Sequence, residues 1–579
     1  MNYKRGIQGV LCGCMGLLLL SGCSNENQQS TESGTTVEDQ SAAQNKNTNV
    51  SYDENDYYTD YEDSDYEEID LGKQSGDVTI TKAGCYVLSG SLKDGSVIVD
   101  AKDQVVRIVL NNAQLYSSDN APVYIKNAEK VILSLPEGTN NTVRDGKSYQ
   151  LDENQEPSAA IFSKDDLTIN GSGSLKVTAN VKNGIQSKDT LKLMSGTYDI
   201  TAVNDGIKGK DALYIQDGTY VVHTDGDGLC TTNTEKGEMV IEGGSFEITA
   251  KQDGLQSESS LMIYEGTFTI TSGGGSVSAV TGTSMQPFGE FDDYQDMDAV
   301  SAKGIKAVTS MTIQKGTFTI SSLDDALHSN GSITLKSGSY RLSSDDDGIH
   351  ADQTLKISGG TVDIAQCYEG LEAGTITISG GSINILASDD GINAASESGQ
   401  ALLNITGGSL YVNAYGDGVD SNQDITMSGG TLVVMGPQND GNGALDYDGT
   451  FTIDGGTLIA LGGSGMAMAP SSSSTQNSVM INLNSSLEAG TLLYLQDEEG
   501  NFLLGVQPER SCSSIVISSP KLTSGETISV MSGGTASKSK DGVVVEGAKG
   551  SEITTLTLSD TITTYGFSGS NPIRGKGRP

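Results

Sequence analysis

The chain has 579 residues and a formal net charge of −40, with 75 acidic against 35 basic residues and no tryptophan. This balance argues against nucleic acid as a partner, because affinity for nucleic acid comes from lysine and arginine neutralising phosphates. Aromatic residues make up only 5% of the chain. That is low for one conventional core but is compatible with a repeat protein, in which each turn buries its apolar face against the next.

The N-terminus has the pattern of an export signal. Lys4 and Arg5 precede a short apolar stretch that ends in Leu20–Cys23, with the letters LSGC. The apolar stretch is too short for a transmembrane helix and is typical of a secretory signal peptide. We predict a lipoprotein signal peptide over residues 1–22, cleavage before Cys23 and lipid on Cys23. The protein would then be exported and anchored in the bacterial cell membrane, facing outward. The alternative is ordinary signal cleavage with an incidental cysteine.

Residues 23–70 are predicted to form a disordered acidic tether. Residues 24–70 contain 14 acidic residues and one basic residue, with few side chains that could build a core. The last part, residues 52–70, alternates tyrosine with aspartate and glutamate. We interpret it as a charged spacer, and the alternative is an adhesive or cation-binding segment.

A repeat of about 22 residues predicts a right-handed parallel β-helix, an all-β solenoid, over residues 71–470. Apolar residues alternate with polar ones in short strands, and equivalent apolar positions recur in fixed columns from turn to turn. The interval of 50 residues between Gly266 and Gly316 is interpreted as two turns with a small insertion. A glycine precedes one strand in each turn, at Gly173, Gly196, Gly218, Gly244, Gly266, Gly316, Gly338, Gly360, Gly381, Gly408, Gly430 and Gly456.

One column of this repeat is aromatic. We expect its side chains to stack inside the solenoid rather than to form an exposed platform for sugars, because they occupy the same alternating position as aliphatic residues in later turns. The column contains Tyr198, Tyr220, Phe246, Phe268, Phe318 and Tyr340.

After the serine-rich run at 471–474 the repeat stops. Residues 471–566 are predicted to form a small antiparallel β-domain that caps the solenoid, because exposed strand edges at its end would promote aggregation. Residues 567–579 are predicted to be a flexible tail.

The corner before one strand of each turn carries an acidic residue followed by glycine, as in Asp205-Gly206-Ile207. Glycine permits a left-handed corner, and aspartate favours turns by bonding its own backbone. This does not explain the doubled carboxylates, because charges about 5 Å apart in stacked turns repel by about 1–3 kcal/mol per pair. Ca²⁺, which takes six to eight oxygen ligands, would offset that repulsion. The candidate ligands are Asp205, Asp227, Asp253, Asp324, Asp325, Asp346, Asp347, Glu369, Asp389, Asp390 and Asp417.

Two histidines, His328 and His350, lie three residues beyond the corner aspartate in adjacent turns. This spacing suits a transition metal, and the alternative is a ladder of polar side chains.

The sequence resembles a family of bacterial cell-surface carbohydrate-binding β-helix proteins known from cellulolytic clostridia. The resemblance extends from about residue 70 to 566 and implies a fold similar to pectate lyases, Ca²⁺ sites, and binding of cellulose and acidic sugars such as polygalacturonate. It supplies no catalytic motif. The segments that carry it are Ala159–Leu167, Asn204–Lys210, Ala302–Ala307, Asp324–Asn330, Gly348–Asp352 and Gly443–Gly449.

Three functions are therefore considered. The first is a non-catalytic surface protein that binds plant cell-wall or acidic polysaccharide with the help of Ca²⁺. The second is a Ca²⁺-dependent polysaccharide lyase of the pectate type, which needs a basic residue near the ion. Arg341 beside Asp345, Asp346 and Asp347 is one candidate for the base. The alternatives are the lysines beside the aspartate column, Lys208, Lys210, Lys303 and Lys306. The third is a structural or adhesive surface rod. The outward-facing candidates for contact with a glycan are Tyr214, Tyr264, Arg341, Tyr411 and Tyr415.

Overall fold

A computed structural model describes residues 50–62, 65–151, 154–277, 300–396, 399–439 and 441–566. The predicted signal peptide, Cys23 and the predicted tail at 567–579 lie outside the described residues. The described chain is nearly all strand, with one short α-helix, α1 (Glu54–Tyr57), and one 3-10 helix, η1 (Leu71–Lys73). No helix within these ranges has the length and apolar character needed to span a membrane.

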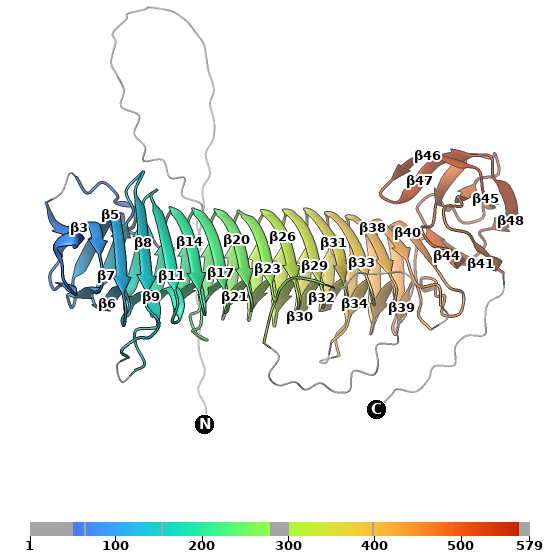
Figure 1. The fold of residues 1–579 in the computed structure, drawn as a ribbon. Helices are drawn as coiled ribbons and strands as arrows, with labels where there is room; N and C mark the ends of the chain where they lie inside the picture. The colour runs from blue at the N-terminus through green and yellow to red at the C-terminus, as the bar shows by residue number, and fades with distance from the viewer. Residues whose placement is uncertain are drawn as a thin grey trace, which may run out of the picture. The chain divides into compact units, whose positions relative to one another are not determined.

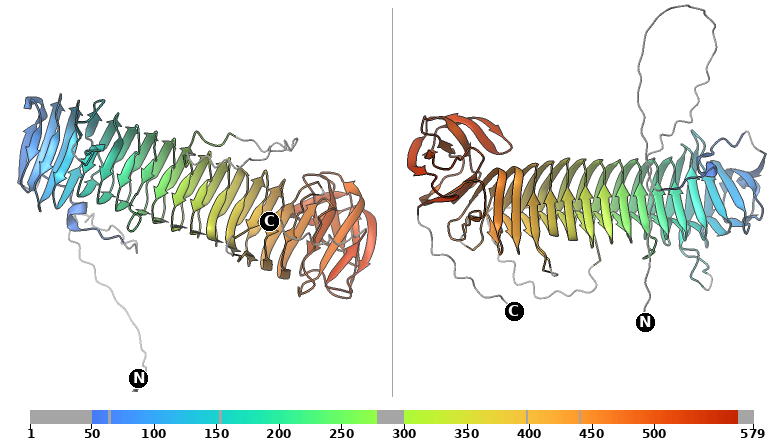
Figure 2. Two further views of the ribbon diagram at one scale, coloured as in Figure 1. Left: turned by 90° about the horizontal axis from the view of Figure 1, so that it is seen from below. Right: turned by 180° about the vertical axis from the view of Figure 1, so that it is seen from behind.

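The fold is the parallel β-solenoid that the repeat predicts (Figure 1). A typical turn consists of three short strands, such as β15 (Ile207–Gly209), β16 (Ala212–Ile215) and β17 (Thr219–Thr224). Each of them pairs in parallel with the equivalent strand of the next turn, so that Ile207 lies opposite Leu229 and Tyr220 lies opposite Phe246. Three parallel sheets therefore run along the solenoid, and Figure 2 shows strands of successive turns lying side by side along it.

The three sheets are numbered in the order in which one turn passes through them. Sheet 1 contains β2 (Val78–Ile80), β4 (Val97–Asp100), β6 (Val123–Asn127), β9 (Ala159–Ser163), β12 (Asn183–Ser187), β15, β18 (Leu229–Cys230), β21 (Leu255–Ser257), β24 (Ile305–Ala307), β27 (Leu327–Ser329), the first parts of β30 (Ile349–Ile357) and β32 (Leu371–Ile378), β34 (Ile392–Ala394), β37 (Val419–Ser421) and β39 (Asp446–Tyr447). Sheet 2 contains β1 (Tyr66–Asp70), the first parts of β3 (Gly84–Leu92) and β5 (Val105–Ser117), β7 (Lys130–Ser134), β10 (Asp166–Asn170), β13 (Thr190–Leu193), β16, β19 (Glu238–Ile241), β22 (Ser260–Ile263), β25 (Ser310–Ile313), β28 (Ser332–Leu335), the last parts of β30 and β32, β35 (Leu402–Ile405), and the first parts of β38 (Asp424–Met435) and β40 (Phe451–Gly462). Sheet 3 contains the last parts of β3 and β5, β8 (Asn140–Asp145), β11 (Ser174–Ala179), β14 (Thr197–Ala202), β17, β20 (Ser245–Ala250), β23 (Thr267–Ser272), β26 (Thr317–Ser322), β29 (Ser339–Ser344), β31 (Thr361–Cys367), β33 (Ser382–Ala387), β36 (Ser409–Ala414), and the last parts of β38 and β40.

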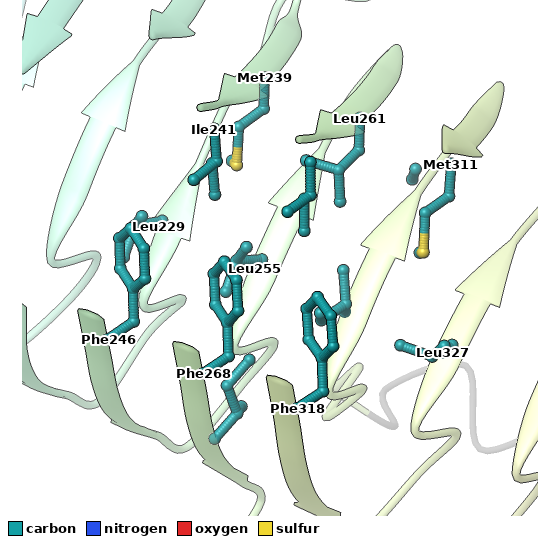
Figure 3. Close-up of a cluster of buried hydrophobic side chains, with 14 of the residues drawn as sticks. Leu229, Met239, Ile241, Phe246, Leu255, Leu261, Phe268, Met311, Phe318 and Leu327 are labelled. Atoms are coloured by element: carbon teal, nitrogen blue, oxygen red, sulfur yellow. The ribbon is translucent and has the colours of Figure 1, made fainter. Parts of the chain in front are cut away.

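The aromatic column forms a continuous stack in the core, which confirms its predicted role. Neighbouring rings from Tyr198 to Tyr340 have centroids 4.7–4.9 Å apart and planes within 2–5° of parallel. The stack follows the spacing of about 4.8 Å between paired strands. Figure 3 shows three of these rings, Phe246, Phe268 and Phe318, beside the aliphatic columns that complete the interior.

Two physical constraints explain why a glycine precedes each ring. At Gly266 the backbone φ is 151°, in the region that favours glycine. A Cβ there would also lie 2.7 Å from the ring of Phe268. The glycine column is therefore needed both for the bend into sheet 3 and for space beneath the stacked rings.

The interval of 50 residues is one turn, not the two turns that the spacing suggested. Phe268 pairs directly with Phe318, and their ring centroids are 4.8 Å apart. All the additional residues therefore belong to a single insertion between β23 and β24, because a missing turn would separate the rings by about 10 Å.

The predicted tether extends too far toward the solenoid. Residues 66–70 form β1, which pairs in parallel with β3, and α1 is docked on sheet 2 by its buried Asp56. The Asp56 carboxylate lies 2.5 Å from Lys130 Nζ and 3.0 Å from Lys192 Nζ, and it accepts a hydrogen bond of 2.6 Å from the Thr168 hydroxyl. Lysines of the solenoid thus supply the counter-charge that the acidic segment itself does not contain.

The C-terminal strands build a second, smaller core next to the last turns. Strand β44 (Cys512–Ser518) pairs antiparallel with β40, and β41 (Ser478–Leu487) and β49 (Ile562–Tyr565) continue that sheet. The remaining strands form a separate antiparallel sheet: β46 (Thr535–Lys540), β47 (Val543–Ala548), β43 (Phe502–Val506), β42 (Leu493–Gln496), β45 (Thr527–Ser532) and β48 (Ser551–Thr557). Antiparallel pairing with β44 covers the last strand edge of sheet 3.

Candidate functional site

The acidic residue at each corner has a structural task. One oxygen of its carboxylate accepts the backbone N–H of the corner residue in the following turn. Asp227 accepts from Asp253 at 3.1 Å, and Asp347 accepts from Glu369 at 3.2 Å. These carboxylates thus tie successive turns together, beside backbone hydrogen bonds such as that from Gly228 N–H to the Asp253 carbonyl. One acid per turn therefore needs no ligand to explain it, while its second oxygen remains available for other partners.

The corner glycines are not left-handed, contrary to the sequence interpretation. Neither Gly228 nor Gly254 has a positive φ. A Cβ on Gly254 would instead lie 2.5 Å from the carbonyl oxygen of Gly304 and would collide with the Ile270 side chain. Glycine is needed because successive corners are packed too closely for a side chain.

In the first half of the solenoid, lysines neutralise three of the predicted ligands, Asp205, Asp324 and Asp325. Lys303 occupies the corner position of its own turn, and its ammonium lies 2.6 Å from Asp324 and 2.8 Å from Asp325. Burial alone would lower the pKa of Lys303, but the two carboxylates raise it to about 12. Lys208 pairs in the same way with Asp205, at 2.8 Å.

Two further predicted ligands in this half lack a close lysine partner. Asp253 accepts a hydrogen bond of 2.7 Å from the Ser301 hydroxyl, with Lys306 3.9 Å away. Burial and the neighbouring carboxylates of Asp253 and Asp205 raise the pKa of Asp227 to about 7.

A second column, three residues after each corner, lies on sheet 1 beside the corner acids. Its character changes from basic to acidic along the chain. The strand register places these side chains in successive turns: Lys208, Cys230, Gln256, Lys306, His328, His350, Glu372, Asn393, Asp420 and Asp446. The sequence interpretation missed Glu372, Asp420 and Asp446, although their fixed distance from the corner was a usable signal.

Both columns are mostly acidic in the last turns, and we call this part the acidic stretch. Within the described residues, none of its carboxylates forms an ion pair with lysine or arginine. Burial, followed in most cases by neighbouring carboxylates, raises the pKa of Asp347 and Asp390 to about 8, of Glu369 and Asp420 to about 7, and of Asp346 and Asp417 to about 6. The acidic stretch consists of Asp346, Asp347, Glu369, Glu372, Asp389, Asp390, Asp417, Asp420 and Asp446.

The doubled acids Asp389 and Asp390 converge on one space. A Cβ added to Gly416 would collide with an oxygen of each of them. Asp390 also accepts the backbone N–H of Asp417 at 2.5 Å, which fixes its position. The two carboxylates lie beside Gly416, which has no side chain to fill the space between them. Carboxylate oxygens are the hard ligands that Ca²⁺ prefers. The residues present at this corner therefore fit the predicted ion.

His350 lies between the last lysine-paired acids, Asp324 and Asp325, and the acidic stretch. Its Nδ1 lies 3.3 Å from Asp347 Oδ2 and 3.4 Å from Glu372 Oε2. Although burial opposes protonation, these carboxylates raise the pKa of His350 to about 9. His328, one turn earlier, is hydrogen-bonded through Nδ1 to Asp325 Oδ2 at 2.7 Å.

Arg341 lies on sheet 3 rather than at the corner. Its guanidinium donates a hydrogen bond of 2.8 Å to Asp363, the residue opposite it in the next turn. The structure therefore pairs Arg341 with Asp363 and does not show it as a base beside Asp346 and Asp347.

The four tyrosines predicted to contact a glycan are not brought together. Tyr214 is on sheet 2, where its hydroxyl is bonded to Glu238, and Tyr264 follows β22 of the same sheet. Tyr411, on sheet 3, lines a cavity of about 400 Å³ against the C-terminal strands, with Asn384 and Gln507 among its other walls. The ring of Tyr415 is covered by the Arg510 guanidinium, 4.3 Å from its centroid.

A parallel β-solenoid in which equivalent side chains recur at one corner from turn to turn belongs to the class of repeat proteins. The chain matches the model of the family described as carbohydrate-binding domain-containing protein over residues 74–348 and 343–549, and it belongs to that family. The family predicted from the sequence resemblance is thereby confirmed.

The chain is similar to two further proteins, one by sequence and one by solved structure. A carbohydrate-binding domain-containing protein of Acetivibrio thermocellus is 38% identical over 135 residues, which cover 23% of this chain and 47% of the relative. The chain thus spans about half the length of this curated relative. A solved structure, the gadolinium derivative of a polysaccharide lyase-like protein from C. thermocellum, is 33% identical, with a TM-score of 0.34, and the match covers 36% of this chain and 91% of that chain.

Proposed function

We propose that this protein binds acidic polysaccharide through Ca²⁺ held on the acidic stretch, without cleaving it. Family membership supports carbohydrate as the ligand class. The observation that carries the proposal is the acidic stretch itself: a row of partly buried carboxylates that has no lysine or arginine counter-charge among the described residues. Earlier along the corner, by contrast, lysines of the protein itself neutralise Asp205, Asp324 and Asp325.

Ca²⁺ would act as a bridge between two sets of carboxylates. Asp389 and Asp390 would supply oxygen ligands from the protein, and the uronate groups of the polysaccharide would complete the coordination. The turn spacing of about 4.8 Å repeats the protein ligands along the solenoid. An extended chain of uronates can then be held at several points, so that weak single contacts add up to firm retention.

The test is retention of the full chain on immobilised polygalacturonate, with Ca²⁺ and with a chelator. We expect retention only with Ca²⁺, and loss of most of it in Asp389→Asn combined with Asp390→Asn. Asparagine keeps the oxygen that accepts the N–H of Asp417, so the corner should remain folded. The matched control removes two exposed charges elsewhere, with Asp217→Asn and Glu247→Gln, and should bind as the unchanged protein does.

Other outcomes would contradict the proposal. Retention that a chelator does not reduce would eliminate the Ca²⁺ bridge, and absence of retention on any glycan would favour a structural or adhesive rod. Growth of the ultraviolet absorbance of unsaturated uronate would favour the lyase. Retention of a neutral glycan that is lost in Asn384→Ala, at the cavity beside Tyr411, would move the binding site to sheet 3.

We also propose that the mature protein is held on the outer face of the cell membrane by lipid on Cys23. The support is the LSGC motif after a short apolar stretch. In the producing cells, the unchanged protein should fractionate with membranes. Cys23→Ser should leave it uncleaved or in the soluble fraction, and unchanged fractionation and processing of this variant would contradict lipidation.

A further inference from the structure

We propose that Asp347, His350 and Glu372 form a site for one divalent transition-metal ion of the Zn²⁺ class, at the start of the acidic stretch and distinct from the Ca²⁺ ligands Asp389 and Asp390. The three side chains come from two successive turns and converge at the start of the acidic stretch. One ligand atom from each lies within 4.8 Å of the other two. The imidazole marks this place as different from the all-oxygen corners further along the solenoid.

The distances favour a shared ion over direct hydrogen bonds. A charge-assisted N–H···O bond measures about 2.7–2.9 Å, whereas His350 Nδ1 is 3.3 Å from Asp347 Oδ2 and 3.4 Å from Glu372 Oε2. Ligands held about 2.0–2.1 Å from a tetrahedral Zn²⁺ are separated from each other by about 3.3–3.4 Å. The spacing therefore matches two edges of a zinc tetrahedron. In the preceding turn, by comparison, His328 makes a direct hydrogen bond to Asp325 at 2.7 Å.

Two further carboxylates, those of Asp325 and Asp352, lie near the imidazole of His350. Asp325 Oδ2 already accepts from His328 and from Lys303, at 2.7 and 2.8 Å, and stands 3.8 Å from His350 Nδ1. On the far side of the ring, Asp352 lies 3.6 Å from Nε2. At 3.6 Å this carboxylate attracts the second ring nitrogen electrostatically, without a direct hydrogen bond.

The site is open enough to load and buried enough to hold an ion. The side chain of Asp347 is 7% exposed, while those of His350 and Glu372 are 27% and 26% exposed. Three protein ligands leave a fourth position for water or for an oxygen of a ligand. Imidazole and carboxylate together suit zinc and similar ions, while Ca²⁺ prefers oxygen ligands alone.

The experiment is a titration of the full chain, without a histidine tag, with Zn²⁺ by calorimetry and with Co²⁺ by visible spectroscopy. The sequence contains only three histidines, so the background is small. We expect one ion per chain, a tetrahedral Co²⁺ spectrum and displacement of Co²⁺ by Zn²⁺. His350→Gln should weaken the affinity by roughly 100-fold or more, and Glu372→Gln should weaken it without changing the thermal unfolding midpoint in chelator.

The matched control is His223→Gln, which changes an exposed histidine on β17 of sheet 3 and should bind as the unchanged protein does. Equal affinity in His350→Gln and His223→Gln, or no binding by the unchanged protein, would overturn the proposal. His350→Gln should keep Ca²⁺-dependent retention on polygalacturonate, and the Asp389→Asn, Asp390→Asn variant should keep its Co²⁺ spectrum. The two proposals can therefore fail separately.

Discussion

Replacement of Asp56 by alanine is expected to release residues 50–62 from sheet 2. The Asp56 side chain is fully buried between Lys130 and Lys192, whose side chains are only 10% and 15% exposed. Removal of one member of a buried ion pair destabilises by about 3–5 kcal/mol, because the remaining charges stay desolvated and unpaired. Hydrogen exchange read by mass spectrometry should show loss of protection in residues 50–62 and in β7, β10 and β13.

The control for this prediction is Glu54→Ala, in the same helix. Glu54 is exposed, so the variant removes the same charge from the segment but should change stability by less than about 0.5 kcal/mol. If exchange in residues 50–62 is equally slow in both variants, the ion pairs with Lys130 and Lys192 do not hold the segment.

This docked segment marks the limit of prediction from composition. Residues 50–70 are acidic and polar, and nothing within them could form a core, which is why they were assigned to the tether. The solenoid supplies the positive charges that hold this segment in place. Lys130 and Lys192 lie two turns apart at the outer surface of sheet 2, and only the folded register brings them to the same carboxylate. A long-range charge partner of this kind leaves no periodic signal in one sequence.

The solenoid was predictable for the opposite reason, because its contacts repeat. The column from Tyr198 to Tyr340 stacks ring on ring as its spacing indicated. The corner acids were found as a column, but their bonds to the backbone of the next turn were not. Lys303 was placed beside the aspartate column, but its ion pairs with Asp324 and Asp325 in the next turn were not predicted.

In the absence of metal ions, the protein is expected to lose stability as the pH rises from about 4 to about 9. Asp347 and Asp390 have pKa values near 8 in the folded chain, and His350 has one near 9, each above the ordinary value of the group. The folded state therefore binds more protons than the unfolded state in this range, and stability that is fully present at the acidic end is lost as each group ionises. Asp56 has the opposite sign: its pKa is lowered, so its contribution is lost only as the pH falls below about 4.

The measurement is the thermal unfolding midpoint from pH 5 to pH 9, with chelator and with Ca²⁺. The midpoint should fall across this range in chelator, and Ca²⁺ should remove most of the fall because the ion takes the place of the protons and binds only the folded chain. Asp390→Asn, which stays neutral, should regain on the order of 2 kcal/mol at pH 9, a value reduced for the partial exposure of the corner. Glu247→Gln, an exposed carboxylate on sheet 3, should leave the profile unchanged. A midpoint that stays level or rises toward pH 9 in chelator would mean that water or backbone groups already solvate the acidic stretch. Cation binding would then relieve no electrostatic repulsion among these carboxylates, and the physical basis for a Ca²⁺ bridge to polysaccharide would be lost.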